Sequence, residues 1–193
     1  MKTYAIITTL FMLALTGCAS FLPPKHQAVL ESAAPCCPNF SDLPYRNLAS
    51  GEKIRDSVGP DTPTFLFPQG KSFFLAIRLQ KDTNSVLIVR THPQNMLYNR
   101  NGHVFVPRIT YLSSRFEIIS SISPEFVVQR PRFGIGESAW RVDLQIPTEA
   151  AFAVIHTSDE ERRKTMRMRD HDQAGGYLYT QTGPAGEVEV ELQ

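Results

Sequence analysis

The chain has 193 residues, and its 20 basic and 19 acidic side chains give a formal net charge of +1. This length is enough for one domain with a sizeable core, and the balanced charge shows no electrostatic footprint for nucleic-acid binding. Twelve phenylalanines and fourteen prolines, without a long helical pattern, favour strands.

The N-terminus predicts an export signal. Lys2 precedes an apolar run at residues 4–15, and the small residues Thr16 and Gly17 follow it. A membrane-spanning helix needs about 20 apolar residues, so this run is too short to cross a bilayer. A charged start, an apolar centre and a small-residue end together predict a signal peptide over residues 1–17.

The motif Leu15-Thr16-Gly17-Cys18 resembles the lipobox of bacterial lipoproteins. This resemblance implies that the sulfur of Cys18 is acylated and that Cys18 becomes the first residue of the mature protein. It also implies a cell-envelope protein that faces the periplasm, and Ala19 rather than Asp after the cysteine favours the outer membrane. The alternative is cleavage at an ordinary small-residue site, after Ala19 or Ser20, which would release a soluble periplasmic protein.

Residues 18–35 are predicted to be a flexible, lipid-anchored linker, because they contain several prolines and no hydrophobic periodicity. The folded domain is expected over residues 36–193. It opens with Cys36 and Cys37, whose adjacent Cα atoms are closer than in most disulfides. A strained vicinal disulfide, two free thiols and intermolecular pairing all remain open, and the vicinal disulfide is our prediction.

Short β-rich runs fill most of the domain, and turn residues separate them. Hairpins are predicted at residues 81–84, at Asn101-Gly102 and at residues 183–186. Along residues 139–146, apolar and polar side chains alternate, which indicates a strand with one buried face. The predicted strands are residues 65–67, 72–79, 86–90, 103–109, 116–119, 126–129, 139–146, 152–155, 177–180 and 188–192.

One helix is predicted near the C-terminus. Ser158 and Glu161 have the spacing of a capping box, and the basic side chains that follow, up to Arg169, suit the end of a helix dipole. With the strands, this gives an all-β, antiparallel sandwich or jelly-roll-like domain with one short helix.

Catalytic and metal-binding patterns are weak in this sequence. The five histidines show no ligand spacing, so we expect no metal, no cofactor and no enzyme activity. Exposed aromatic rings can stack on sugars, and for Trp140 a place in the core is the competing interpretation because its strand face also carries Val142 and Leu144. The candidates for a carbohydrate-binding face are Tyr98, Tyr111, Trp140, Tyr177 and Tyr179.

Several motifs resemble the maltose-operon periplasmic protein (MalM) family. They are Ala34-Pro35-Cys36-Cys37, residues 40–45, Gly59-Pro60-Asp61 with the strands over 65–74, the strand-to-helix junction at 154–161, and the closing hairpin. The resemblance implies envelope residence and an association with maltose and maltodextrin uptake, without an established enzyme activity. The lipobox distinguishes this chain from the soluble enterobacterial member of that family.

The resulting functional expectation is a non-enzymatic lipoprotein that assists carbohydrate uptake, by binding an oligosaccharide or by contacting a porin or transporter. The alternative is a structural or protein-interaction lipoprotein of the envelope without a small-molecule ligand.

Overall fold

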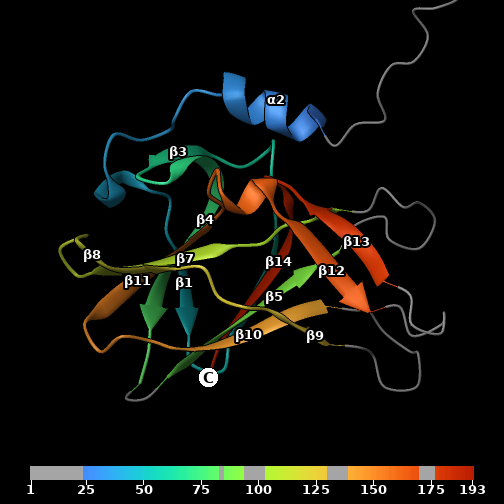
Figure 1. Cartoon of the computed structure of the whole chain (residues 1–193). Helices are drawn as coiled ribbons and strands as arrows, with labels where there is room; N and C mark the ends of the chain where they lie inside the picture. The colour runs from blue at the N-terminus through green and yellow to red at the C-terminus, as the bar shows by residue number, and fades with distance from the viewer. Residues whose placement is uncertain (1–23, 83–84, 94–102, 130–138, 170–176) are drawn as a thin grey trace, which may run out of the picture.

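The structure, a computed structural model, describes residues 24–82, 85–93, 103–129, 139–169 and 177–193. Within these ranges the chain forms one α-helix, α2 (Pro24–Ser32), and two 3-10 turns, η2 (Phe40–Asp42) and η4 (Glu161–Arg163) (Figure 1). The strands are β1 (Arg46–Ala49), β2 (Lys53–Val58), β3 (Thr64–Phe67), β4 (Gly70–Gln80), β5 (Val86–His92), β6 (His103–Val104), β7 (Arg108–Ser113), β8 (Ile118–Ile122), β9 (Val127–Gln129), β10 (Ala139–Gln145), β11 (Ala150–His156), β12 (Thr165–Arg169), β13 (Tyr177–Thr182) and β14 (Gly186–Leu192).

Two sheets form a sandwich. The first has the order β1-β4-β11-β7-β8, with β3 attached to β4, and the second has the order β2-β14-β5-β10-β9. Their neighbouring strands are antiparallel, except β1 with β4. The main core takes buried side chains from both sheets, among them Ile77 of β4 and Val190 of β14. The predicted all-β sandwich is confirmed.

Strand β4 is buried on both of its faces, which explains its continuous apolar run. Phe73 and Ile77 belong to the core between the sheets, whereas Phe74 and Ala76 belong to a second apolar cluster on the outer side. Strand β3 and the chain around η2 cover this second cluster. Cys36 and Cys37 are joined by a disulfide, and Cys37 packs against the same cluster.

A third, small sheet has the order β12-β13-β6. It lies beside a cluster of Val104, Val106 and Trp140, against which Met166 of β12 packs. The alternation predicted for residues 139–146 is also present, because Trp140 is buried and Asp143 on the other face is exposed.

Two of the predicted hairpins are wrong. Strands β4 and β5 follow each other in sequence but belong to opposite sheets, because β4 pairs with β1, β3 and β11 while β5 pairs with β10 and β14. The predicted closing hairpin is also split, since β13 belongs to the small sheet and β14 to the second large sheet. The Asn101-Gly102 hairpin lies outside the described residues.

The helix predicted after Ser158 is wrong beyond its first turn. Both capping-box bonds form: the Glu161 amide donates to Ser158 Oγ at 3.1 Å, and the Ser158 amide donates to the Glu161 carboxylate at 3.0 Å. The chain then leaves the single turn η4 and becomes β12, which pairs with β13. The alternating sequence Thr165-Met166-Arg167-Met168-Arg169 suits a strand better than a helix.

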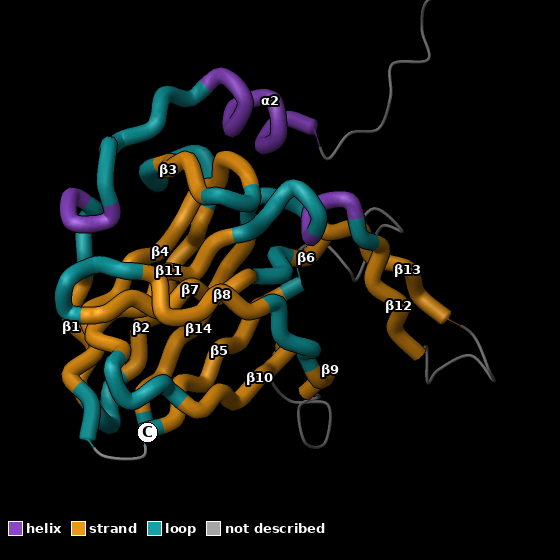
Figure 2. The backbone as a smooth tube through the Cα atoms, turned by 60° about the vertical axis from the view of Figure 1, so that its left-hand side comes forward, coloured by secondary structure: helices purple, strands orange, loops and turns teal. Residues whose placement is uncertain are grey.

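Residues 24–32 of the expected linker form a packed helix. Leu30 of α2 is only 1% exposed and belongs to the main core. The helix lies beside β3 at the end of the sandwich opposite the C-terminus in both views (Figures 1 and 2). Residues 24–32 are therefore part of the domain rather than of a flexible tether. Among the described residues, no helix is long and apolar enough to cross a membrane.

Candidate functional site

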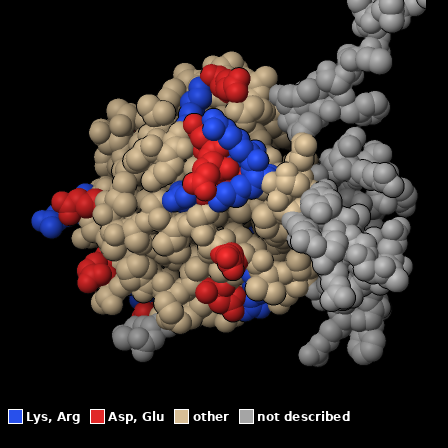
Figure 3. Space-filling view, in the orientation of Figure 1, with Lys and Arg blue, Asp and Glu red and all other residues tan. Residues whose placement is uncertain are grey.

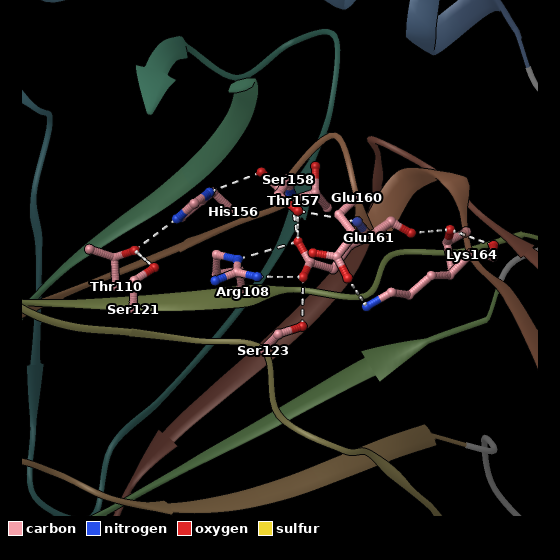
Figure 4. Close-up of polar contacts among 11 residues, drawn as sticks. Arg108, Thr110, Ser121, Ser123, His156, Thr157, Ser158, Glu160, Glu161 and Lys164 are labelled. Carbon is pink, nitrogen blue, oxygen red and sulfur yellow. Dashed lines mark hydrogen bonds and ion pairs between the residues drawn. The ribbon is translucent and has the colours of Figure 1, made fainter. Parts of the chain in front are cut away.

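A buried carboxylate organises the polar residues where η4 meets β7 and β11. Glu161 is 0% exposed. Its Oε1 accepts hydrogen bonds from Arg108 Nη2 at 2.8 Å and from Ser123 Oγ at 2.6 Å, while Oε2 accepts from the amide and hydroxyl of Ser158 (Figure 4). Burial alone would raise the pKa of Glu161, but these donors and the charge of Arg108 lower it to about 2.

His156 lies beside this carboxylate in a fixed tautomer. Its Nδ1 lies 3.0 Å from the carbonyl oxygen of Thr157, which can only accept, so Nδ1 carries the proton. Nε2 then accepts from Thr110 Oγ1 at 2.9 Å, and Thr110 in turn accepts from Ser121 at 2.9 Å (Figure 4). Burial lowers the pKa of His156 to about 4, and its ring stacks on Phe67 with centroids 3.7 Å apart.

This arrangement is closed to chemistry with a substrate. A nucleophilic triad needs a histidine that bonds both a hydroxyl nucleophile and a carboxylate. Here His156 bonds Thr110 and a backbone carbonyl, whereas Glu161 bonds Ser158 and Arg108. Both ring nitrogens are occupied and the imidazole is 0% exposed. The cluster therefore fixes η4 against β7 and β11.

A pocket of about 580 Å³ lies next to this cluster, between α2 and the η4 turn. Charged side chains of both signs gather on this face of the molecule (Figure 3). The lining residues are Gln27, Leu30, Glu31, Lys71, Asp159, Arg162, Arg163, Gln181, Thr182, Gly183 and Pro184. Among the described lining residues none is aromatic, so the pocket has no platform for stacking on a sugar ring.

Internal contacts already occupy most of the pocket's charges. Lys71 Nζ donates to the carbonyl oxygens of Glu31 at 2.6 Å and Ala33 at 2.9 Å, which neutralises the C-terminal end of α2. Arg162 pairs with Asp159 and also donates to Thr157 Oγ1 at 2.9 Å. Arg163 is exposed, and its side chain forms no hydrogen bond or ion pair within the described part of the chain.

Backbone geometry brings Asp159 to the edge of the pocket. Gly70 has a φ of +118°, and a Cβ atom built on it would lie 2.3 Å from Asp159 Oδ1. The Asp159 amide donates to the carbonyl oxygen of Gln69 at 3.1 Å. Only glycine meets both the positive φ and the close approach at this turn.

Two of the five predicted sugar-stacking residues are buried. Tyr111 is 1% exposed and Trp140 is 2% exposed, so neither ring can stack on a ligand at the surface. For Tyr111 this prediction is wrong, and for Trp140 the competing core interpretation is correct. Tyr98 lies outside the described residues. Tyr177 and Tyr179 belong to β13, but their side chains lie outside the description.

The remaining predicted site residues are Cys18, Cys36 and Cys37, of which the structure describes Cys36 and Cys37. Cys18 lies outside the described residues, and Cys36 and Cys37 follow α2 in the sequence and form the disulfide described above. His26 of α2 contacts His103 through ring centroids 6.0 Å apart. Within the described ranges, no three potential metal ligands come together. The sequence did not predict the carboxylate cluster around Glu161. The capping-box spacing of Ser158 and Glu161 was the one sequence signal that pointed to it.

Comparison of the sequence with models of known protein families finds no match, and comparison with curated proteins finds none. The resemblance to the MalM family therefore rests on the sequence motifs alone.

Proposed function

We propose that this protein is a non-enzymatic lipoprotein of the bacterial cell envelope, anchored through Cys18, which assists carbohydrate uptake by contacting a porin or transporter. The anchor is supported by Leu15-Thr16-Gly17-Cys18 at the end of a short apolar run. Acyl chains contribute about 0.8 kcal/mol for each CH₂ they bury, so two or more chains hold a protein stably at a membrane. The closed surroundings of His156 and Glu161 support a non-enzymatic role.

The anchor is tested by Cys18→Ser in cells. Wild-type protein is expected to incorporate labelled palmitate and to partition into the detergent phase, and the variant is expected to do neither. Cys36→Ser with Cys37→Ser is the matched control, because it removes the other two thiols and leaves the lipobox intact. Equal labelling of the Cys18→Ser variant and the wild type would rule out this anchor.

The single observation that favours a protein partner is the pair of outer edge strands β8 and β9. Each ends one of the two large sheets, and four residues of chain connect them. Ile118 of β8 is 44% exposed and Val127 of β9 is 70% exposed. Edge strands have unpaired backbone groups, and exposed apolar side chains beside them provide a surface on which another protein can add contacts.

Photo-crosslinking in intact envelopes tests this surface. A crosslinking amino acid at Ile118 or Val127 is expected to capture a porin or transporter subunit, identified by mass spectrometry. The control position is Lys53 on β2, an edge strand on the other side of the second sheet, whose side chain is 66% exposed. Identical products from all three positions would contradict a specific contact at β8 and β9.

Direct oligosaccharide binding is the second candidate for a role in carbohydrate uptake. With Tyr111 and Trp140 buried, its remaining support is the motif resemblance and the polar pocket. Maltooligosaccharides of several lengths should then raise the melting temperature of the wild-type protein, and Gln181→Ala in the pocket should reduce this shift. An unchanged melting temperature with every sugar would leave the protein contact, or a purely structural envelope role, as the function.

A further inference from the structure

The tether between the proposed anchor and the folded domain is short. Only five residues separate Cys18 from Pro24, where α2 begins. A chain of this length spans about 20 Å when it is fully extended. If Cys18 carries lipid, as the proposed function requires, the start of α2 stays within about 20 Å of the membrane surface.

Helix α2 transmits this constraint to the whole domain, because it cannot move independently of the sandwich. Leu30 is 1% exposed within the main core, and Lys71 holds the carbonyl oxygens of Glu31 and Ala33 at the end of the helix. The end of the molecule formed by α2, β3 and η4, which we name the α2 end, therefore faces the lipid. The C-terminus lies at the opposite end (Figures 1 and 2).

The α2 end has apolar side chains that the fold leaves uncovered. Leu66 is 64% exposed and Val29 is 39% exposed. Leu66 lies directly opposite Lys71 in the β3–β4 register, so both side chains are on the same face of this hairpin. The neighbours of Leu66 on β3, Phe65 and Phe67, are buried in the second cluster. Leu66 thus projects toward the side that α2 occupies.

Charge at the α2 end favours an anionic surface. The pocket contributes Lys71, Arg162 and Arg163 against Glu31 and Asp159. Asp159 is paired with Arg162, and Glu31 accepts a hydrogen bond from Gln27 at 2.8 Å. Arg163 is exposed and available to a phosphate, because its guanidinium forms no ion pair with the described residues.

We propose that the α2 end is a membrane-docking face that rests on anionic phospholipid. Leu66 and Val29 enter the headgroup layer, and Arg163 meets lipid phosphates. The opposite end then projects into the periplasm. Strand β4 runs between the two ends, and its nine-residue rise from Lys71 to Gln80 corresponds to about 30 Å. Lys81 Nζ donates to the carbonyl oxygen of Thr148 at 2.8 Å, so Thr148 marks the distal end.

The orientation is tested on the full acylated protein in vesicles of phosphatidylcholine and phosphatidylglycerol. Leu66→Cys and Thr148→Cys are each labelled with a fluorophore under non-reducing conditions, which leave the Cys36–Cys37 disulfide intact. A spin label on the lipid headgroup is expected to quench the dye at position 66 strongly and the dye at 148 negligibly. Equal quenching, or stronger quenching at 148, overturns the proposal while lipid anchoring stands.

A second measurement does not depend on acylation. The full chain with Cys18→Ser is expected to bind phosphatidylglycerol vesicles better than pure phosphatidylcholine vesicles. Adding Arg163→Ala should lower its partition onto the anionic vesicles about fivefold. Arg115→Ala is the control, because Arg115 is 82% exposed and lies in the turn between β7 and β8. Binding that depends on neither phosphatidylglycerol nor Arg163 overturns the docking face, whatever the state of Cys18.

Discussion

Replacing the buried Glu161 by Gln should reveal how much the carboxylate cluster stabilises the fold. A pKa of about 2 in the folded state, against an ordinary 4.5, corresponds to about 3 kcal/mol. Because the folded-state pKa of this acid is depressed, its contribution is complete above pH 5 and disappears as the pH falls to about 2. Glu161→Gln also leaves the guanidinium of Arg108, which is only 15% exposed, without its charged partner.

Urea unfolding measured from pH 7 to pH 2 tests this expectation. At pH 7, Glu161→Gln should lower the free energy of unfolding by about 3 kcal/mol, and its stability should depend less on pH between 5 and 2. The matched control is Glu160→Gln, because Glu160 pairs with Lys164 at 3.0 Å but is 72% exposed. That change should cost less than about 0.5 kcal/mol. A loss below about 1 kcal/mol for Glu161→Gln, or parallel pH curves, would refute this reasoning.

Three further predictions concern other parts of the fold. The free energy of unfolding should fall as the pH drops from about 6.5 to 4, because the unfolded chain protonates His156 while burial holds its folded-state pKa at about 4. His156→Gln should remove this pH dependence in the same titration. An unchanged stability curve for the variant would contradict the prediction. Gly70→Ala should cost about 2 kcal/mol or more in thermal unfolding, because of its positive φ and the approach of Asp159, and more than Gly51→Ala, which meets open space. Leu30→Ala should lower the free energy of unfolding by about 2 to 4 kcal/mol and expose α2 to proteolysis. Val29→Ala, at a 39% exposed position, should have little effect. Equal effects of the two changes would mean that α2 is not packed on the domain.

Most of the strands could be located from sequence, although β1, β2 and β12 were not predicted. The partners of the strands could not be located. Turn residues at 81–84 correctly ended β4 and separated it from β5, yet a reversal of direction does not specify whether the next strand stays in the same sheet. The apolar run from Phe73 to Ile77 was the sequence signal that bears on how β4 is placed. A strand with apolar residues on both faces is covered on both sides, and β4 lies between the core and the second cluster.

Local signals failed where long-range contacts decide the structure. The Ser158 to Glu161 capping box forms as predicted, but β12 pairs with β13 and so ends the helix after one turn. The partners that hold Glu161, Arg108 and Ser123, are 53 and 38 residues away in sequence. No rule of sequence spacing connects residues this far apart, so the cluster could be identified only from the folded structure. Leu30 was assigned to a linker for the same reason, because its burial depends on β-strands far along the chain.

The position of β14 has a consequence for the order in which the protein can assemble. This strand comes from the last residues of the sequence, yet it is an inner strand that pairs with β2 on one side and β5 on the other. Arg55 and Glu187, which pair across β2 and β14, are 132 residues apart. A chain that emerges N-terminus first holds β2 and β5 without their shared neighbour until residues 186–192 appear. Folding of the second sheet is therefore expected to be slow and to be completed only after residues 186–192 have been synthesised. Under the export that we propose, this sheet would stay incomplete while the chain is threaded through a membrane.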